Sequence, residues 1–225
     1  HSVSSTAIVG GGSVPRPGEV SLAHNGVLFL DELPEFARDT LEVLRQPLED
    51  GVVSVTRIHN QAQYQSSFMM VASMNPCPCG FYGSKTKKCR CSAKDIRRYL
   101  DRISGPLLDR IDIQVEGGAA ESSAEVGARV RKVRELQQAR YAQDGIHCNA
   151  QLDAGLSKKY CPMTPEATAL LHMAVERMGM SMRAYGRVVK VARTIADMDG
   201  ADTIGTTHVA EAIQYRELDG KYWKG

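Results

Sequence analysis

The sequence predicts an α/β protein in which a parallel-sheet core is followed by an all-helical part. Two short apolar runs, 26–30 and 68–74, each end in polar residues, as buried strands of a parallel sheet do. Beyond Gly117 and Gly118 the apolar residues recur almost throughout at helical spacing. We therefore divide the chain into an α/β core at 1–118 and a helical region at 119–225.

The predicted elements of the first part alternate between strand and helix patterns. In order they are a Gly-, Ser- and Pro-rich loop to residue 25, a strand at 26–30, a helix at 35–49, a hairpin made by 52–58 and 62–65, a strand at 68–74, a helix capped by Ser92 and a strand at 111–116. The second part contains helical patterns at 123–143, 165–178, 181–198 and 207–218.

Composition is that of a globular protein: 225 residues with a formal net charge of +2. No window approaches ~18 uninterrupted apolar residues, so we predict no membrane span. The chain starts without Met or a signal-peptide pattern, which we interpret as a cut with sequence missing upstream. Four of the six cysteines cluster within fifteen residues, whereas a secreted disulfide scaffold spaces them along the chain, so we expect a reducing cytoplasm.

Two carboxylates, Asp31 and Glu32, directly follow the first apolar run. Ligands of open α/β sheets bind at the carboxyl ends of the strands, where such residues are placed. The pattern is typical of a Walker B strand, in which Asp31 holds Mg²⁺ through water and Glu32 orients and activates the attacking water. The alternative is an apolar strand followed by a solvated acidic turn.

Asn75 follows the second apolar run in the same way. An Asn amide can hydrogen-bond to a γ-phosphate and orient the attacking water at once. The alternative is an Asn that caps the turn at Pro76. Two apolar strands that each end in a suitable polar residue favour the nucleotide-site interpretation over either alternative.

Four segments resemble the magnesium-chelatase-like AAA+ ATPases of the YifB/ComM type. They are 26–36 (GVLFLDELPEF), 74–80 (MNPCPCG), 105–112 (GPLLDRID) and 181–197 (SMRAYGR through KVARTIAD). They occur in the family's order and span nearly the whole chain. The resemblance implies an incomplete AAA+ parallel-sheet core, from Walker B onward, followed by an all-helical lid.

The resemblance also implies a homo-oligomeric ring, a hexamer, with Mg²⁺ and ATP bound between subunits. Arg110 would be the arginine finger that faces outward to the neighbour's ATP, and Arg183 would be the sensor 2 residue that contacts phosphate from the lid. A planar guanidinium spreads charge over the transferring phosphoryl oxygens. For both arginines the alternative is a surface salt bridge.

One motif of such ATPases is missing, because no Gly-x-x-x-x-Gly-Lys-Ser/Thr occurs and the glycine run at 10–12 has no suitably placed Lys. The family places that phosphate-binding loop upstream. We therefore predict that this chain alone is inactive as an ATPase. It is also expected to be monomeric, since part of each nucleotide interface is absent.

Four cysteines, Cys77, Cys79, Cys89 and Cys91, form two C-x-C pairs nine residues apart. Zn²⁺ takes four thiolates tetrahedrally and can order a loop too polar to bury itself. We predict a structural zinc site, because four cysteines leave no open coordination position. The alternatives are free thiols or reversible disulfides.

A basic run follows the first cysteine pair: 85–102 holds eight Lys and Arg against Asp95 and Asp101, a balance of +6 in a chain of +2 overall. Concentrated positive charge suits phosphate contacts. Related ring ATPases place a hairpin that touches DNA where 52–65 lies. The predicted DNA contacts are Arg57, Lys85, Lys87 and Lys88. A solvated face or salt bridges between subunits are the alternatives.

The predicted function is a part of an ATP-hydrolysing ring motor, a DNA helicase and branch-migration ATPase of the ComM type, which acts in natural transformation. Two alternatives stay open. One is a chelatase-type motor acting on a tetrapyrrole-binding partner, and the other is a non-hydrolysing, zinc-stabilised interaction module. DNA as a partner and the absence of a membrane partner follow from the first interpretation.

Overall fold

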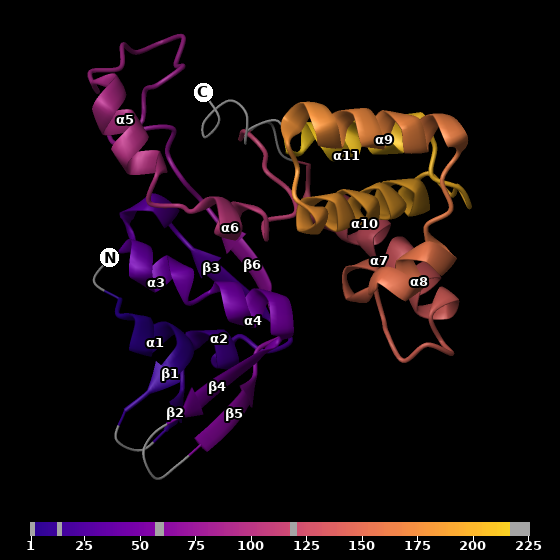
Figure 1. Ribbon diagram of the computed structural model, residues 1–225, viewed down its shortest axis with the longest axis horizontal. Helices are drawn as coiled ribbons and strands as arrows, with labels where there is room; N and C mark the ends of the chain where they lie inside the picture. Colours follow the sequence, from indigo (N-terminus) through magenta and orange to yellow (C-terminus); the bar gives the residue numbers. More distant parts are fainter. Residues whose placement is uncertain (1–2, 13–14, 57–60, 118–120, 217–225) are drawn as a thin grey trace. The chain divides into compact units, whose positions relative to one another are not determined.

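The computed structural model describes residues 3–12, 15–56, 61–117 and 121–216. The chain forms two compact units, one that ends at Arg110 and one that begins at Ile111 (Figure 1). Each unit is described by itself. The predicted boundary between residues 118 and 119 lies outside the described residues.

Three small sheets of two strands each occur in the described part of the first unit. The central one pairs β3 (Val27–Leu30) with β6 (Met69–Ala72) in parallel, with Leu30 opposite Ala72. The other two are antiparallel: β1 (Gly10–Gly11) with β2 (Arg16–Pro17), and β4 (Val52–Thr56) with β5 (Gln61–Gln65). The predicted pair of parallel strands and the predicted hairpin are therefore confirmed.

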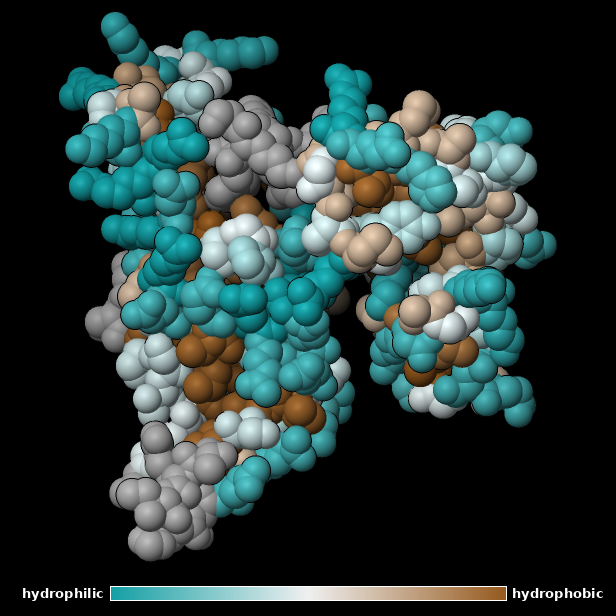
Figure 2. Space-filling model, in the orientation of Figure 1, coloured by the Kyte–Doolittle hydropathy of each residue, from teal (hydrophilic) through white to brown (hydrophobic). Residues whose placement is uncertain are grey.

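Strand β3 of the central sheet buries one set of its side chains and exposes the other. Leu28 and Leu30 are buried, whereas Val27 and Phe29 are each 59 % exposed and Met69 is 63 % exposed. Hydrophobic surface is visible between hydrophilic side chains on this unit (Figure 2). The prediction that the run 26–30 forms a strand buried on both faces is wrong for the described residues, because side chains alternate along a strand and only one set of β3 reaches the core.

Short helices complete the first unit. They are α1 (Ser5–Val9), α2 (Glu19–Leu22), η1 (Leu33–Glu35), α3 (Arg38–Glu42), α4 (Arg45–Asp50), α5 (Ala93–Leu100) and α6 (Gly105–Leu108). The single helix predicted at 35–49 is instead divided among η1, α3 and α4. Pro47 has no N–H and its ring crowds the preceding turn, so the helix restarts at Arg45 and places Pro47 in a first turn.

The second unit is helical, as predicted. It contains α7 (Ser123–Arg140), η2 (Asn149–Gln151), α8 (Ala154–Tyr160), α9 (Pro165–Met178), α10 (Met182–Met198) and α11 (Thr206–Gln214). The strand predicted at 111–116 is not formed. In that segment Gln114 N donates to the carbonyl of Tyr215 at 2.9 Å, and Arg216 Nη1 donates to the carbonyl of Ile111 at 2.5 Å. The segment is therefore held by one backbone hydrogen bond and one side-chain hydrogen bond instead of the repeated backbone hydrogen bonds of a β-sheet.

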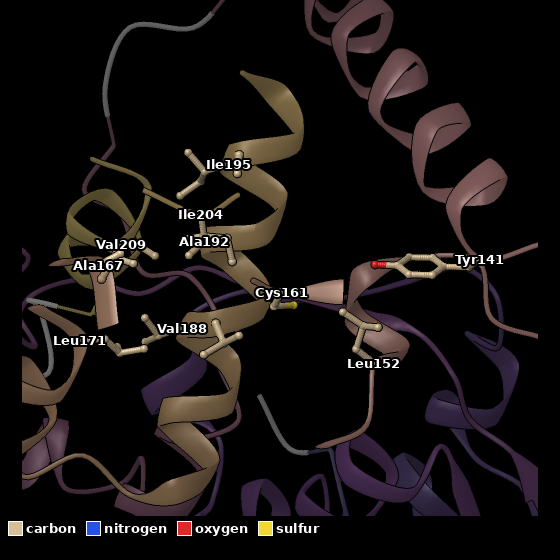
Figure 3. Packing of buried hydrophobic residues seen from close by; sticks show 13 residues of the cluster. Tyr141, Leu152, Cys161, Ala167, Leu171, Val188, Ala192, Ile195, Ile204 and Val209 are labelled. Carbon is tan, nitrogen blue, oxygen red and sulfur yellow. The ribbon is translucent and has the colours of Figure 1, made fainter. Parts of the chain in front are cut away.

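The core of the second unit surrounds α10 (Figure 3). Val188, Ala192 and Ile195 face Leu171 and Val209, and residues from the α7–α9 region cover the rest of the helix. Nothing among the described helices is both long and apolar enough to cross a bilayer.

Candidate functional site

Two carboxylates stand at the carboxyl end of β3, on the same rim as Ser73 at the end of β6. The parallel register that sets Leu30 opposite Ala72 brings Asp31 beside Ser73. The Ser73 hydroxyl donates a short hydrogen bond to Asp31 Oδ1, which also accepts from Glu32 N at 3.1 Å. Glu32 N lies 3.2 Å from Ser73 Oγ as well. The carboxylate of Asp31 is therefore held by the neighbouring strand.

Glu32 has an unusual backbone, with φ 52° and ψ 52° in the left-handed region. Asn25 is the only other non-glycine residue with positive φ in the described chain. Such a conformation costs on the order of 1–3 kcal/mol and is found mainly at functional sites. Here it turns the chain sharply from β3 into η1 at the rim that carries both carboxylates.

Asn75 lies three residues beyond the end of β6 and is exposed. Tyr99 of α5 is hydrogen-bonded to the backbone of Asn75: burial and the charges of Glu35 and Glu32 raise the pKa of the Tyr99 phenol, and this hydrogen bond opposes the rise. Asp31 and Glu32 follow β3 directly, and Asn75 follows β6 after two further residues, on the side where both parallel strands end. The structure adds Ser73 and Tyr99, which sequence reasoning missed.

Arg110 does not face outward, so that expectation is wrong for this chain. The side chain is 5 % exposed and pairs with the carboxylate of Glu49. Its Nη1 donates to the carbonyl of Pro106 at 2.7 Å and its Nε to the carbonyl of Arg45 at 3.1 Å. Acceptors within its own unit therefore satisfy the guanidinium.

Arg183, in contrast, is exposed at the second residue of α10, in the second unit. Ser181 caps this helix by accepting from Ala184 N at 3.1 Å, which fixes where its first turn begins. Arg183 is therefore at the surface of the second unit.

The four cysteines of the C-x-C pairs converge on one point. Their Sγ atoms all lie within 4.8 Å of one another. The Sγ of Cys77 lies 3.4 Å from that of Cys79 and 3.7 Å from that of Cys89, and the Sγ atoms of Cys79 and Cys89 are 3.6 Å apart. Four sulfurs at ~2.3 Å from a zinc ion lie about 3.8 Å apart in a tetrahedron, whereas a disulfide needs ~2.05 Å. All six cysteines are free thiols. The donor set therefore fits a tetrahedral Zn²⁺.

The thiols of this cluster differ in acidity. Hydrogen bonds from the backbone of Arg90 and Phe81 lower the pKa of Cys79 to about 6. Burial and a hydrogen bond with Cys79 raise the pKa of Cys91 to about 12. Four thiolates repel one another without a cation, and a divalent metal removes that obstacle when it binds.

The loop between the two cysteine pairs carries the predicted DNA-contacting lysines. Lys85, Lys87 and Lys88 are all exposed. The other predicted contact, Arg57, lies outside the described residues. Between residues 76 and 94 the chain contains no Asp or Glu, so the positive charge of this loop is not offset locally.

Two family models match this chain. One, described as magnesium chelatase, subunit ChlI, matches residues 1–125, and the other, described as the C-terminal part of the same subunit, matches residues 120–216. The chain therefore belongs to the magnesium chelatase ChlI family, a mixed α/β class with a short parallel sheet and several helices.

Within that class the chain is similar to competence protein ComM of Haemophilus influenzae: 97 % of the present chain aligns with ComM at 44 % identity. An uncharacterised protein of Escherichia coli, YifB, matches with the same identity and coverage, and an uncharacterised protein of Mycobacterium bovis is 40 % identical over 98 % of the chain. The chain spans 44 % of the length of ComM and YifB and 46 % of the third. The resemblance expected from the sequence is confirmed.

Proposed function

We propose that this chain is part of an ATP-hydrolysing ring motor of the ComM type that acts on DNA. The observation that carries the proposal is the shared rim of β3 and β6, where Ser73 donates to the Asp31 carboxylate across the two parallel strands. Membership of the magnesium chelatase ChlI family supports it, and so does the similarity to a protein named for competence.

In this proposal Asp31 holds the Mg²⁺ of Mg-ATP, and the metal neutralises charge on the phosphates when bound. The Ser73 hydroxyl and the Glu32 N–H fix the Asp31 carboxylate in advance. Glu32 orients the attacking water and Asn75 donates to the γ-phosphate. Arg183 contacts phosphate from the helical unit, which acts as the lid.

The ring is proposed to be a hexamer in which Arg110 serves the ATP of a neighbouring subunit. Because the guanidinium is paired with Glu49, it must first exchange this carboxylate for phosphate. Glu49→Gln therefore tests the role of Arg110: weakening the pair should ease that exchange, whereas Arg110→Ala should abolish hydrolysis in the assembled ring. Equal activity of Arg110→Ala and the natural protein would remove Arg110 from the mechanism.

Zinc is proposed to hold the cysteine loop together, with all four Sγ atoms as ligands. Elemental analysis of protein produced in zinc-supplemented medium should give one zinc per chain, and Cys89→Ser should reduce that content. Protein without zinc under these conditions would contradict the site. The free cysteines also favour a reducing compartment, and we place the protein in the cytoplasm.

The motor is tested by the ATPase activity of the full-length protein, measured without DNA and with single-stranded or branched DNA. Glu32→Gln should reduce hydrolysis by about 10²–10⁴-fold, because it removes the group that orients and deprotonates water. Asp39→Asn, an exposed carboxylate of α3, is the matched control and should leave the rate unchanged. The 225-residue chain alone should be inactive.

The DNA response separates the candidate functions. Stimulation by DNA supports a helicase or branch-migration motor. Hydrolysis that is indifferent to DNA would favour a chelatase-type motor acting on a tetrapyrrole-binding partner, and the absence of any hydrolysis would favour an interaction module.

A further inference from the structure

The loop between the two cysteine pairs exposes two adjacent aromatic rings. Phe81 is 36 % exposed and Tyr82 is 44 % exposed. Water-exposed aromatic surface is unfavourable by roughly 25 cal/mol per Å², so rings left in this position are candidates for contact with a ligand. Neither the nucleotide residues nor the proposed zinc ligands use them.

The same two residues are held in a defined turn. Gly80 and Gly83 flank them with φ of 79° and 77°, values that glycine adopts without strain. Tyr82 N donates to Cys77 Sγ at 3.3 Å, and Ser84 N donates to the carbonyl of Phe81 at 3.1 Å. The cysteine cluster therefore fixes the backbone that presents the rings.

Positive charge surrounds the aromatic pair. The residues from 76 to 94 include five cationic side chains and no acidic one: Lys85, Lys87, Lys88, Arg90 and Lys94. Zinc with four thiolates carries −2, so the segment keeps 5 − 2 = +3 when the metal is bound. All five cations are exposed, and Figure 2 shows long hydrophilic side chains projecting from this loop and from α5. Lys87 Nζ lies 5.0 Å from the centre of the Phe81 ring.

Exposed rings beside exposed cations match one class of ligand, single-stranded nucleic acid. Its bases present free π-faces that stack on aromatic side chains, while its phosphates attract lysine and arginine. In a duplex the bases are already stacked on one another, so the rings cannot reach them. A lipid surface fits less well, because membrane binding scales with the apolar area inserted and this loop offers only two partly exposed rings.

We propose that this loop, residues 77–91, binds single-stranded DNA, with Phe81 and Tyr82 stacking on bases and Lys85, Lys87, Lys88 and Arg90 contacting phosphates. The proposal rests on the proposed DNA motor and names its substrate as the unpaired strand. The aromatic pair supplies preference for unpaired bases, and the cations supply affinity that depends on salt.

The test measures binding of a fluorescein-labelled oligo-dT and of a labelled duplex by full-length, zinc-loaded protein, using fluorescence anisotropy at several salt concentrations. Phe81→Leu/Tyr82→Leu should raise the Kd for oligo-dT about 10- to 100-fold, with the salt slope and duplex binding unchanged. Lys85→Gln/Lys87→Gln/Lys88→Gln should instead lower the slope of log Kd against log salt by about 2, at ~0.7 for each lost contact.

Two controls distinguish stacking from damage to the loop. Phe81→Trp/Tyr82→Phe keeps both rings and should bind oligo-dT like the natural protein, with one zinc per chain. Phe29→Leu removes an exposed ring of β3 and should have no effect on binding.

An unchanged Kd for oligo-dT in the Phe81→Leu/Tyr82→Leu variant would overturn the inference, as would an equal loss of single-strand and duplex binding. Loss of binding to anionic phosphatidylglycerol vesicles, with oligo-dT binding intact, would assign the rings to a membrane and also overturn it. ATP hydrolysis without DNA is measured in parallel. If the protein hydrolyses ATP normally but the Phe81→Leu/Tyr82→Leu variant binds oligo-dT with an unchanged Kd, only the inference about the loop is contradicted. If the natural protein hydrolyses no ATP, the proposed function itself is contradicted.

Discussion

The two compact units differ in how completely they bury their apolar residues. In the helical unit, α10 is surrounded: Ala192 and Ala196 of this helix and Leu171 of α9 have no exposed surface. In the α/β unit, the β3–β6 sheet leaves Val27 and Phe29 each 59 % exposed. The helical unit therefore has a closed core of its own, whereas the sheet that carries the carboxylates has one uncovered face in the described chain.

The units also differ in how they satisfy buried charge. Asp197 of the helical unit is 4 % exposed and accepts hydrogen bonds from four side chains, those of Arg140, Arg193, Asn149 and Gln137. In the α/β unit, the carboxylates of Asp31 and Glu32 stand at the sheet edge. Fully paired charge stabilises a fixed core, whereas the Asp31 carboxylate is exposed at the sheet edge and hydrogen-bonded to Ser73 there. Chemistry is thus expected from the unit with the less complete core.

The largest effect expected is that of Asp197→Ala in the helical unit. Removing this carboxylate leaves Arg193, which is 1 % exposed, without its buried partner, and such a loss costs about 3–5 kcal/mol. Urea-dependent hydrogen exchange of the α10 amides measures this loss separately from the amides of β3 and β6. Asp199→Ala is the control: its side chain is 63 % exposed and pairs with His208, so less than about 1 kcal/mol should be lost.

The same carboxylate predicts a dependence on pH. Burial alone would raise the pKa of Asp197, but hydrogen bonds from Arg140 and Asn149 and the charge of Arg193 outweigh burial and lower the pKa below its ordinary 3.8. A lowered pKa gives stability that is present above the unfolded-state value and is lost as the pH falls through the folded-state value. The contribution of Asp197 to the hydrogen-exchange protection of α10 should therefore be constant from pH 5 to 7 and should decrease below about pH 4. If the Asp197→Asn variant lost the same protection over this pH range, the loss would be due to other titratable groups.

Leu171→Ala should cause the next largest loss of stability in the helical unit. Leu171 is completely buried against α10, so truncation removes apolar contacts and leaves a cavity at a cost of about 2–5 kcal/mol. Met173→Ala on the same helix is the matched control, because Met173 is 61 % exposed and should change stability by less than about 0.5 kcal/mol. Similar losses for the two variants would show that the helical unit is not closed around Leu171.

Local signals predicted most of the elements. Apolar runs located β3 and β6, and the predicted capping residue Ser92 stands directly before α5. An apolar run does not reveal what covers each face of its strand, which is why the exposure of Phe29 was missed. The environment depends on other segments.

The site residues divide along the same line. The carboxylates and the cysteines could be predicted as candidate sites because each group is contiguous or closely spaced in sequence. The partner of Arg110 is Glu49, 61 residues away, and Ser73 is 42 residues from Asp31. Such pairs are set by the tertiary fold, so no local pattern predicts them. The αL backbone of Glu32 is likewise imposed by the turn out of β3.

Ser122→Ala should have a smaller, local effect on α7. The Ser122 hydroxyl accepts from Glu125 N, and the Glu125 carboxylate accepts from Ser122 N at 3.2 Å, a reciprocal pair that satisfies two N–H groups. Loss of the cap should cost about 1 kcal/mol. It should appear as faster hydrogen exchange in the first turn of α7, with α10 unaffected. Ser123→Ala, at the next position, lacks this pairing and should leave exchange unchanged.

The smallest effect on stability is expected from Phe29→Ser in β3. This variant tests whether the face of the sheet that carries Phe29 is uncovered. Because Phe29 is 59 % exposed and faces away from buried Leu28 and Leu30, replacing it in this chain should change the hydrogen-exchange stability of β3 by less than about 0.5 kcal/mol. Concentrated samples should also self-associate less by light scattering, because exposed apolar surface on a strand promotes association. A loss above about 2 kcal/mol would mean that this face is packed in solution, and the contrast between an open sheet and a closed helical core would then fail.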